Sequence, residues 1–364
     1  MFKLTCNHCG RELPQNFTGF LCSCGGLLSL AMEGKFSPGR IVEDDLSIFR
    51  YRHFLPLTGD EMISLGEGMT PLIPYTADGE KEVFLKLESL SPTGSFKDRG
   101  AAVLITRARE LGVSELVEDS SGNAGSAIAA YSARAGIRAR IFVPESTSKG
   151  KLKLIRKFGA ELILVPGGRA EAAKAAFTEA GKSYYASHYY NPYFFQGTKT
   201  FAYEIWEQLK GVPAGIVIPV GNGTLLLGAY IGFSELLSSG IIDKLPRLFA
   251  VQSTACAPIY EKLKGKPFLP SNEKGLAEGI MIKEPVRLAE IIEAIKQSKG
   301  EVITVSDDEI KKAEEELFSL GIAVEPTSCV SLAGYWRFKE LGLLPSGRVV
   351  IAITGSGLKG GFDA

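Results

Sequence analysis

The sequence lacks several features that mark whole classes of proteins. Its 41 lysines and arginines equal its 41 aspartates and glutamates, so no net charge favours nucleic acid or an anionic membrane as a partner. Although 45% of its 364 residues are hydrophobic, no apolar run is long enough to span a bilayer. The first residues lack the apolar core of a secretion signal. We therefore expect a cytoplasmic protein with no membrane and no nucleic-acid partner, long enough for two domains.

Cysteine is scarce except near the N-terminal end, where a C-x2-C pair and a C-x-C pair lie close together. The four residues are Cys6, Cys9, Cys22 and Cys24. Gly10 and Gly25, beside the two pairs, let the backbone turn tightly around a metal. Four thiolates at this spacing predict a closed, structural zinc site of the zinc-ribbon type in residues 1–30. Two disulfides are the alternative, which the absence of a secretion signal disfavours.

Beyond the cysteines, short apolar segments alternate with helical patterns. The predicted strands are 83–87, 115–119, 140–143, 161–165, 183–186, 215–218, 248–252 and 349–353. The predicted helices are 101–111, 126–135, 149–158, 169–180, 198–209, 226–237, 258–263 and a segment in which Ile310, Ala313, Leu317 and Leu320 recur at helical spacing. This alternation predicts an α/β protein with parallel sheets covered by helices on both faces.

We expect three parts in this chain. A zinc ribbon occupies residues 1–30, and a small α/β domain occupies residues 96–199. A large, cofactor-binding α/β domain combines residues 31–95 with residues 200–364, and it includes a long loop at 265–285. Both α/β domains are expected to be doubly wound.

The most informative stretch is Ser91–Gly100, because it places Lys97 between a predicted strand and a predicted helix. Lys97 follows small residues and Phe96. A lysine that is desolvated beside an aromatic ring loses its proton more readily, and the neutral amine can then bond to an aldehyde. The alternative is an ordinary lysine at a helix N-terminus, paired with Asp98.

Three further motifs follow predicted strands, at residues 120–125, 219–225 and 354–359. A glycine-rich turn before a helix exposes backbone N–H groups and can bind an anion, although each turn alone is most often only a loop. All four motifs lie at carboxyl ends of strands, where open α/β sheets bind their ligands. Together they match pyridoxal phosphate, which needs an amine for its aldehyde, a partner for its ring oxygen, donors for its phosphate and a partner for its pyridine nitrogen.

These segments resemble the pyridoxal-phosphate enzymes of fold type II, and within them threonine synthase. The resemblance runs from about residue 60 to the C-terminus. It is carried by Ser95–Gly100, Ser121–Asn123, Gly221–Leu225 and Thr354–Lys359, with further similarity in Leu65–Leu72, Asn191–Tyr193, Gly197–Thr200 and Glu325–Ser328.

The resemblance implies a carbon–oxygen lyase acting on phosphates, which converts O-phospho-L-homoserine and water to L-threonine and phosphate by γ-elimination and β-addition. Lys97 would hold the cofactor and remove the α-proton of the substrate. We further expect a homodimer that acts on a small amino acid. The other implied cofactor-binding residues are Asn123, Gly221, Asn222, Gly223, Thr224, Leu225 and Thr354, and the implied substrate-binding residues are Ser121, Gly122, Asn123 and Asn191.

One segment departs from the family pattern. After Asn-Pro the family usually has Tyr-Arg, whereas this sequence has Tyr193 and Phe194, so an arginine suited to a substrate phosphate is missing. Related reactions therefore stay open, namely β-replacement or ammonia elimination, as in cysteate synthase or threonine/serine dehydratase. His188 lies in the same region. An isolated histidine is more often packed or at the surface, but its position keeps His188 a candidate.

Overall fold

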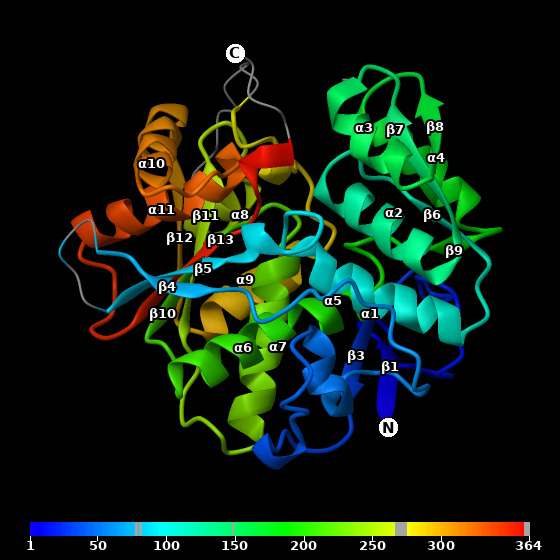
Figure 1. Ribbon diagram of the computed structural model, residues 1–364, viewed down its shortest axis with the longest axis horizontal. Helices are drawn as coiled ribbons and strands as arrows, with labels where there is room; N and C mark the ends of the chain where they lie inside the picture. Colours follow the sequence, from blue (N-terminus) through cyan, green and yellow to red (C-terminus); the bar gives the residue numbers. More distant parts are fainter. Residues whose placement is uncertain (77–78, 80–81, 148, 266–274, 360–364) are drawn as a thin grey trace. The chain divides into compact units, whose positions relative to one another are not determined.

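The computed structural model describes residues 1–76, 79, 82–147, 149–265 and 275–359. The chain divides into two compact units, labelled by element in Figure 1. Unit 1 comprises residues 1–68 and 97–200, and unit 2 comprises residues 69–96 and 201–364. Among the described residues, no helix is long and apolar enough to cross a bilayer. Of the loop predicted at 265–285, residues 266–274 lie outside the described part.

Unit 1 contains two sheets. A small antiparallel sheet has the strand order β2-β1-β3, and a parallel sheet has the order β8-β7-β6-β9. The strands are β1 Phe2–Cys6, β2 Glu12–Leu13, β3 Leu28–Met32, β6 Glu115–Glu118, β7 Arg138–Pro144, β8 Glu161–Val165 and β9 Tyr184–Tyr185. The central strand β6 pairs with β7 on one side and with β9 on the other, so its carboxyl end lies in the middle of the sheet.

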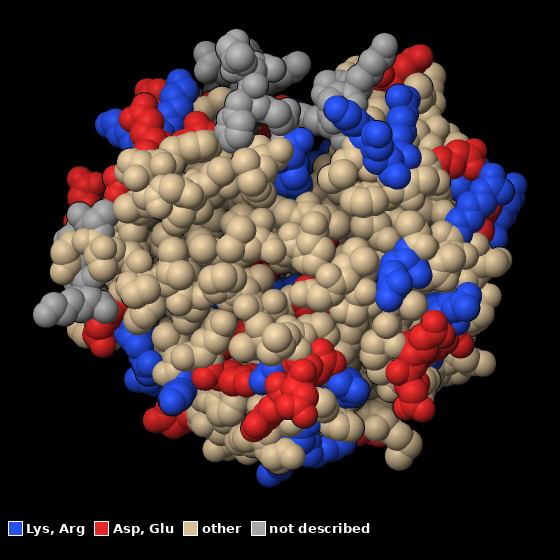
Figure 2. Space-filling view, viewed as in Figure 1, with Lys and Arg blue, Asp and Glu red and all other residues tan. Residues whose placement is uncertain are grey.

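The helices of unit 1 show the burial expected of amphipathic segments. In α3, Leu152 and Ile155 are buried, whereas Lys153, Arg156 and Lys157 are exposed, and Figure 2 shows basic side chains gathered over this helix. This separation explains the dense charge of the segment as a solvated face. The helices are α1 Lys97–Glu110, α2 Asn123–Ala135, α3 Lys149–Lys157, α4 Arg169–Glu179 and α5 Pro192–Thr198.

Unit 2 is built on one six-stranded sheet in the order β12-β11-β10-β13-β5-β4, in which all neighbours are parallel except β4 and β5. The strands are β4 Leu72–Pro74, β5 Val83–Leu87, β10 Gly215–Pro219, β11 Arg247–Ser253, β12 Glu301–Val305 and β13 Val349–Ile353. The helices are α6 Thr200–Leu209, α7 Thr224–Ser238, α8 Pro258–Lys264, α9 Leu288–Gln297, α10 Asp307–Ser319 and α11 Pro326–Glu340. The parallel α/β architecture is confirmed.

The helix predicted at 198–209 is confirmed as α6, Thr200–Leu209, whereas the preceding helix α5, Pro192–Thr198, was not predicted. Asn191 caps α5 by accepting a hydrogen bond from the N–H of Tyr193, and Pro192 occupies the first turn, where its missing N–H costs nothing. Every residue of α5 is buried. The segment is only seven residues long and is buried on every side, polar residues included, so its sequence shows no separation of apolar and polar faces that would indicate a helical period.

The compact units have different bounds from the predicted domains. Residues 31–68, assigned from the sequence to the large domain, lie in unit 1. Ile48, Phe49 and Ile63 from this stretch share one hydrophobic core with α1, α2 and the ribbon strands. The ribbon is therefore packed into unit 1, and the three-part division stays a prediction.

Candidate functional site

Lys97 is the first residue of α1, four residues earlier than the predicted helix start. It is half-buried, and its Nζ lies 5.9 Å from the centroid of the Phe194 ring. Phe194 comes from α5, which packs against α1. The lysine thus has the partly desolvated, aromatic surroundings that its sequence context predicted.

The loop Ser121–Asn123 joins the carboxyl end of β6 to α2. Asn123 is the first residue of α2, and no side chain caps this helix. Gly122 is exposed, and a Cβ placed on it would have only the Ser120 hydroxyl, at 4.0 Å, within reach. The space beside Gly122 is therefore open at the N-terminus of α2, although the Gly122 N–H donates to the Ser120 hydroxyl at 3.3 Å, and a helix N-terminus attracts an anionic group.

A buried acid–imidazole pair lies next to this loop, and the sequence pattern pointed only to its imidazole. Glu118 is the last residue of β6 and is fully buried. Its Oε1 lies 2.7 Å from Nδ1 of His188, which is also buried. Burial raises the pKa of Glu118 well above its usual range, and the neighbouring Asp119 carboxylate adds to this. Burial likewise lowers the pKa of His188, with the charges of Lys97 and Arg169 adding to the effect.

Asp119 is held differently from Glu118, although the two are adjacent. Its carboxylate accepts hydrogen bonds from the hydroxyls of Tyr185 at 2.9 Å and Tyr189 at 2.6 Å. Burial raises the pKa of Asp119, and these two hydroxyls oppose the rise. The tyrosines therefore give Asp119 the partners that a buried carboxylate needs.

Asn191, predicted to bind substrate, has structural partners in unit 1. Besides capping α5, its Nδ2 donates to the hydroxyl of Tyr184 at 3.0 Å and to the carbonyl of Tyr185 at 3.2 Å. These bonds occupy both the oxygen and the nitrogen of the amide. A contact of Asn191 with substrate stays a prediction.

In unit 2, the loops after β5, β10 and β13 leave the same edge of the sheet, because these neighbouring strands are parallel. The loop after β10 contains Gly221, Asn222 and Gly223 and leads into α7, whose first residues are Thr224 and Leu225. Gly223 has φ 74°, in the left-handed region, and no side chain caps α7. The predicted phosphate loop is thus a glycine turn that leads into a helix N-terminus without a side-chain cap, which favours negative charge.

Thr354 follows β13 directly and is buried. Its Oγ1 lies 3.3 Å from Oγ of Ser328, the third residue of α11. The carbonyl of Thr354 accepts a hydrogen bond from the N–H of Phe96, the residue that precedes Lys97 in the chain. The structure therefore adds Ser328 as a second hydroxyl beside Thr354, which the sequence pattern showed only as a family motif.

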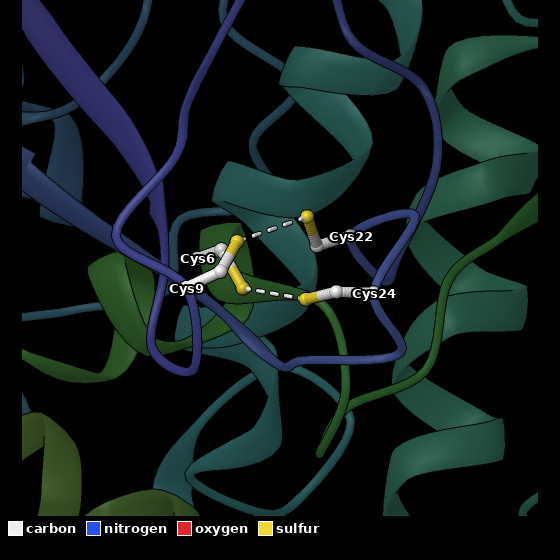
Figure 3. Close-up of side chains that lie close together, drawn as sticks. All are labelled: Cys6, Cys9, Cys22 and Cys24. Atoms are coloured by element: carbon white, nitrogen blue, oxygen red, sulfur yellow. Dashed lines mark hydrogen bonds between the residues drawn. The ribbon is translucent and has the colours of Figure 1, made fainter.

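The four N-terminal cysteines come together as predicted (Figure 3). All four Sγ atoms lie within 4.8 Å of one another, with 3.5 Å between Cys6 and Cys24 and 3.8 Å between Cys9 and Cys22. Tetrahedral zinc with Zn–S bonds of about 2.3 Å requires S–S separations of about 3.8 Å, whereas a disulfide requires about 2.05 Å. None of the four is in a disulfide.

The turns around the cysteines also suit a metal. Gly10 and Gly25 have φ 70° and 80°, a conformation that other residues rarely adopt. The thiol pKa of Cys22 is lowered to about 6, chiefly because the backbone N–H of Cys24 stabilises the thiolate. This site is compatible with a closed, structural ion.

An α/β fold with a lysine at the start of a helix and two uncapped helix N-termini after glycine loops meets the needs of pyridoxal phosphate for an amine and for phosphate donors. The family described as "Pyridoxal-phosphate dependent enzyme" matches residues 63–355. Threonine synthase of Methanocaldococcus jannaschii is 36% identical over 97% of this chain and 92% of its own length. Threonine synthase of Methanosarcina acetivorans is 34% identical over 97% and 91%.

A solved structure supports the same assignment. The L-serine ammonia-lyase of Rhizomucor miehei superposes with a TM-score of 0.68 at 26% identity, covering 79% of this chain and 93% of its own. The chain belongs to the pyridoxal-phosphate-dependent enzyme family, and its reaction falls in the lyase class.

Proposed function

We propose that this enzyme is a threonine synthase, which converts O-phospho-L-homoserine and water to L-threonine and phosphate. The placement of Lys97 at the start of α1 beside the ring of Phe194 is the observation that carries the cofactor assignment on which this proposal depends. The relatives that are named threonine synthase and cover nearly the whole chain support it.

We assign each part of the cofactor to the residues whose chemistry suits it. The amine of Lys97 would bond to the aldehyde, and Asn123 would donate to the ring oxygen. The N–H groups of Gly221–Leu225 and the hydroxyl of Thr224 would bind the phosphate. The hydroxyl of Thr354, which lies 3.3 Å from that of Ser328, would pair with the pyridine nitrogen. When bound, the cofactor supplies an electron sink for a carbanion at the substrate α-carbon.

The protein's own groups then perform binding and proton transfer. The amides of Ser121, Gly122 and Asn123 bind the substrate α-carboxylate at the N-terminus of α2. Lys97, once free of the cofactor, removes the α-proton as a general base. A hydroxyl at Thr354 does not keep the pyridine nitrogen protonated as a carboxylate would, which favours elimination and replacement at the β and γ carbons.

A second reaction is favoured by one specific observation. Phe194 lies where the family's arginine would stand, and its ring packs so closely on Gly100 that a Cβ at this position would clash with the ring. A packed phenyl ring offers no donor to a phosphate leaving group. Ammonia elimination from serine or threonine, or replacement at the β carbon, needs no such donor.

A kinetic comparison separates the two reactions. We expect phosphate release from O-phosphohomoserine, with less from O-phosphoserine and little ammonia from serine or threonine. The matched variant is Phe194→Arg, which restores the family's residue and should lower KM for O-phosphohomoserine if the pocket receives a phosphate. Ready deamination of threonine by a protein inert toward O-phosphohomoserine would establish the second reaction.

We also propose that Cys6, Cys9, Cys22 and Cys24 hold one structural zinc ion. The ribbon packs within unit 1, with the ring of Phe2 6.0 Å from that of Tyr193 and the ring of Phe20 4.9 Å from that of Tyr185. Metal analysis should give one zinc per chain. Cys9→Ser should lose the metal and increase hydrogen exchange in residues 1–32, whereas Cys256→Ser should not. Disulfides mapped among the four cysteines would contradict the proposal.

A further inference from the structure

Ser328 is a buried serine of unit 2 to which the proposed reaction gives no role. It is the third residue of α11 and is fully buried. Its Oγ accepts a hydrogen bond from the Gly355 N–H at 2.6 Å. The same oxygen lies 2.8 Å from the Gly355 carbonyl oxygen and 3.3 Å from Oγ1 of Thr354. One side chain of α11 therefore contacts both of the residues that directly follow β13.

The main chain at Thr354 and Gly355 is held from two sides. The Thr354 carbonyl accepts a hydrogen bond from the N–H of Phe96 at 3.1 Å, and the Gly355 carbonyl accepts one from the N–H of Glu325 at 3.2 Å. These bonds fix the backbone on which the Thr354 side chain is mounted. The hydrogen of its hydroxyl, which rotates to suit its partners, is the part that can still change direction.

The orientation of the Thr354 hydroxyl depends on Ser328. Thr354 is buried, and buried hydroxyls take their partners from the protein. Within the described part of the chain, Ser328 is the one hydrogen-bond partner of Thr354 Oγ1. Because a hydroxyl has one hydrogen and two lone pairs, the direction of the Thr354 hydrogen is set by whether Ser328 donates to it or accepts from it.

Ser328 has one hydrogen and two acceptors within reach. If this hydrogen points to the Gly355 carbonyl, Ser328 Oγ accepts from Thr354, whose hydrogen is then used within the protein. If it points to Thr354 Oγ1 instead, the Thr354 hydrogen is free to point to a further acceptor. The second arrangement leaves no buried group unpaired, because the Gly355 carbonyl keeps its bond from the Glu325 N–H.

We propose that Ser328 is a positioning residue that makes Thr354 a hydrogen-bond donor to the pyridine nitrogen of the cofactor. This inference rests on the proposed role of Thr354. The donors then run in one direction, from the Gly355 N–H to the Ser328 hydroxyl, from there to the Thr354 hydroxyl, and from Thr354 to the nitrogen. Hydrogen bonds in such a chain polarise one another, which strengthens the last donor. An unprotonated nitrogen can accept this bond, whereas a protonated nitrogen cannot.

The test observes the pyridine nitrogen itself. Pyridoxal phosphate labelled with ¹⁵N in its ring is bound to the apoenzyme, and the ¹⁵N chemical shift is measured by NMR. Accepting a hydrogen bond moves this shift from the value of free pyridine toward that of pyridinium. We expect an intermediate shift in the wild type. In Ser328→Ala the shift should return part of the way to the free-pyridine value, because Thr354 is no longer polarised or oriented.

The matched control is Ser331→Ala. Ser331 is also a fully buried serine of α11, but its hydroxyl donates to the carbonyls of Ser328 and Ala352, at 2.8 Å and 2.7 Å. Its loss should destabilise the fold in the same way and leave the ¹⁵N shift at the wild-type value. A structural serine and a positioning serine are thereby distinguished.

A second comparison asks whether Ser328 acts through Thr354. The variant Thr354→Val removes the hydroxyl that would contact the nitrogen, so its ¹⁵N shift should lie close to that of free pyridine. Adding Ser328→Ala to Thr354→Val should then cause no further change, because the two residues form one chain of hydrogen bonds.

Three results would overturn the inference and leave Lys97 as the cofactor lysine. They are an equal ¹⁵N shift in the wild type and Ser328→Ala, a change caused by Ser328→Ala when Thr354 is already valine, and the shift of a pyridinium in the wild type. The last of these needs no variant, so the test does not depend on the folding of Ser328→Ala. A wild-type chain that takes up no cofactor on Lys97 would instead refute the proposed function, and this inference with it.

Discussion

Two glycine loops of this protein share a backbone arrangement and differ in the residues that precede them at the end of the strand. The loop Ser121–Asn123 and the loop Gly221–Gly223 each follow a parallel strand and lead into a helix that no side chain caps. The buried carboxyls Glu118 and Asp119 precede the first loop, whereas Pro219 and Val220 precede the second.

The difference assigns a separate task to each loop. An apolar strand end before a helix that no side chain caps suits a permanent dianion such as the cofactor phosphate, because the helix N-terminus favours negative charge. Buried carboxyls with raised pKa values, such as those before the first loop, suit a site where protons are transferred near an amine. We therefore expect the first loop to serve the reacting end of the cofactor and the second loop to anchor its phosphate.

The largest effect should come from Lys97→Ala, which removes the reacting amine itself. Turnover should fall at least about a thousandfold, and borohydride should no longer fix the cofactor to the chain. Mass spectrometry of the reduced protein checks the attachment site, with exposed Lys153→Ala as the control. Retention of a borohydride-fixed cofactor in Lys97→Ala would show that another lysine holds it.

The next effect should come from Gly223→Ala in the anchor loop. Alanine in the left-handed conformation is strained by about 1–2 kcal/mol, and its Cβ would meet the Ile291 side chain at 2.5 Å. We expect pyridoxal phosphate affinity to fall about tenfold or more, measured by fluorescence titration of the apoenzyme. Gly240→Ala is the matched control, since φ is 73° there but nothing lies within 4 Å. Equal losses in both variants would mean that the anchor loop has no special role.

A smaller and more selective effect is expected for Gly122→Ala in the first loop. The added methyl meets open space, so the fold should be unaffected, but the methyl would obstruct the approach of a substrate carboxylate. KM should rise severalfold while cofactor affinity stays unchanged. Gly39→Ala, which also meets open space, is the control for stability. If Gly122→Ala weakened the binding of the cofactor and not that of the substrate, the proposed division of tasks between the two loops would be contradicted.

The smallest expected effect is on the free energy of unfolding and comes from Glu118, which precedes the first loop. The folded-state pKa of Glu118 is raised, so neutral Glu118 contributes stability that is present below the unfolded pKa of about 4.3. This stability is lost as the pH rises toward the folded pKa. Between pH 5 and pH 8, the unfolding free energy of the wild type should therefore fall relative to that of Glu118→Gln. The fall should be about 1.4 kcal/mol for each pH unit that separates the folded pKa from the unfolded one within this window, and urea titrations at the two pH values measure it.

Glu309 supplies a control of opposite sign. Although burial acts to raise its pKa, the Ser306 N–H and hydroxyl and the charge of Arg337 lower it overall. Its stabilising contribution is present above the unfolded pKa and is lost as the pH falls, so Glu309→Gln should be the less stable chain at pH 8. Parallel pH profiles for the two variants would show that Glu118 does not have a raised pKa.

Local pattern alone determined a large part of this protein. The strands Val83–Leu87, Glu161–Val165 and Val349–Ile353 have the bounds that the apolar runs predicted. The cysteine pairs predicted their own cluster, because two short turns bring four thiolates together without help from distant residues. The glycine loops could be placed at strand ends because strand, turn and helix signals follow each other directly in the sequence.

Tertiary structure alone decided the pairing of Glu118 with His188. Seventy residues separate them, and the contact depends on β6 and β9 pairing in parallel, which sets Val117 opposite Tyr185. A buried glutamate at the end of a strand looks like any surface acid in the sequence, because burial is a property of the packed neighbours and not of the residue. For the same reason the sequence pattern did not predict α5. Because α1, the ribbon and the rest of unit 1 cover every face of this helix, its sequence has no exposed polar face that would indicate a helical period.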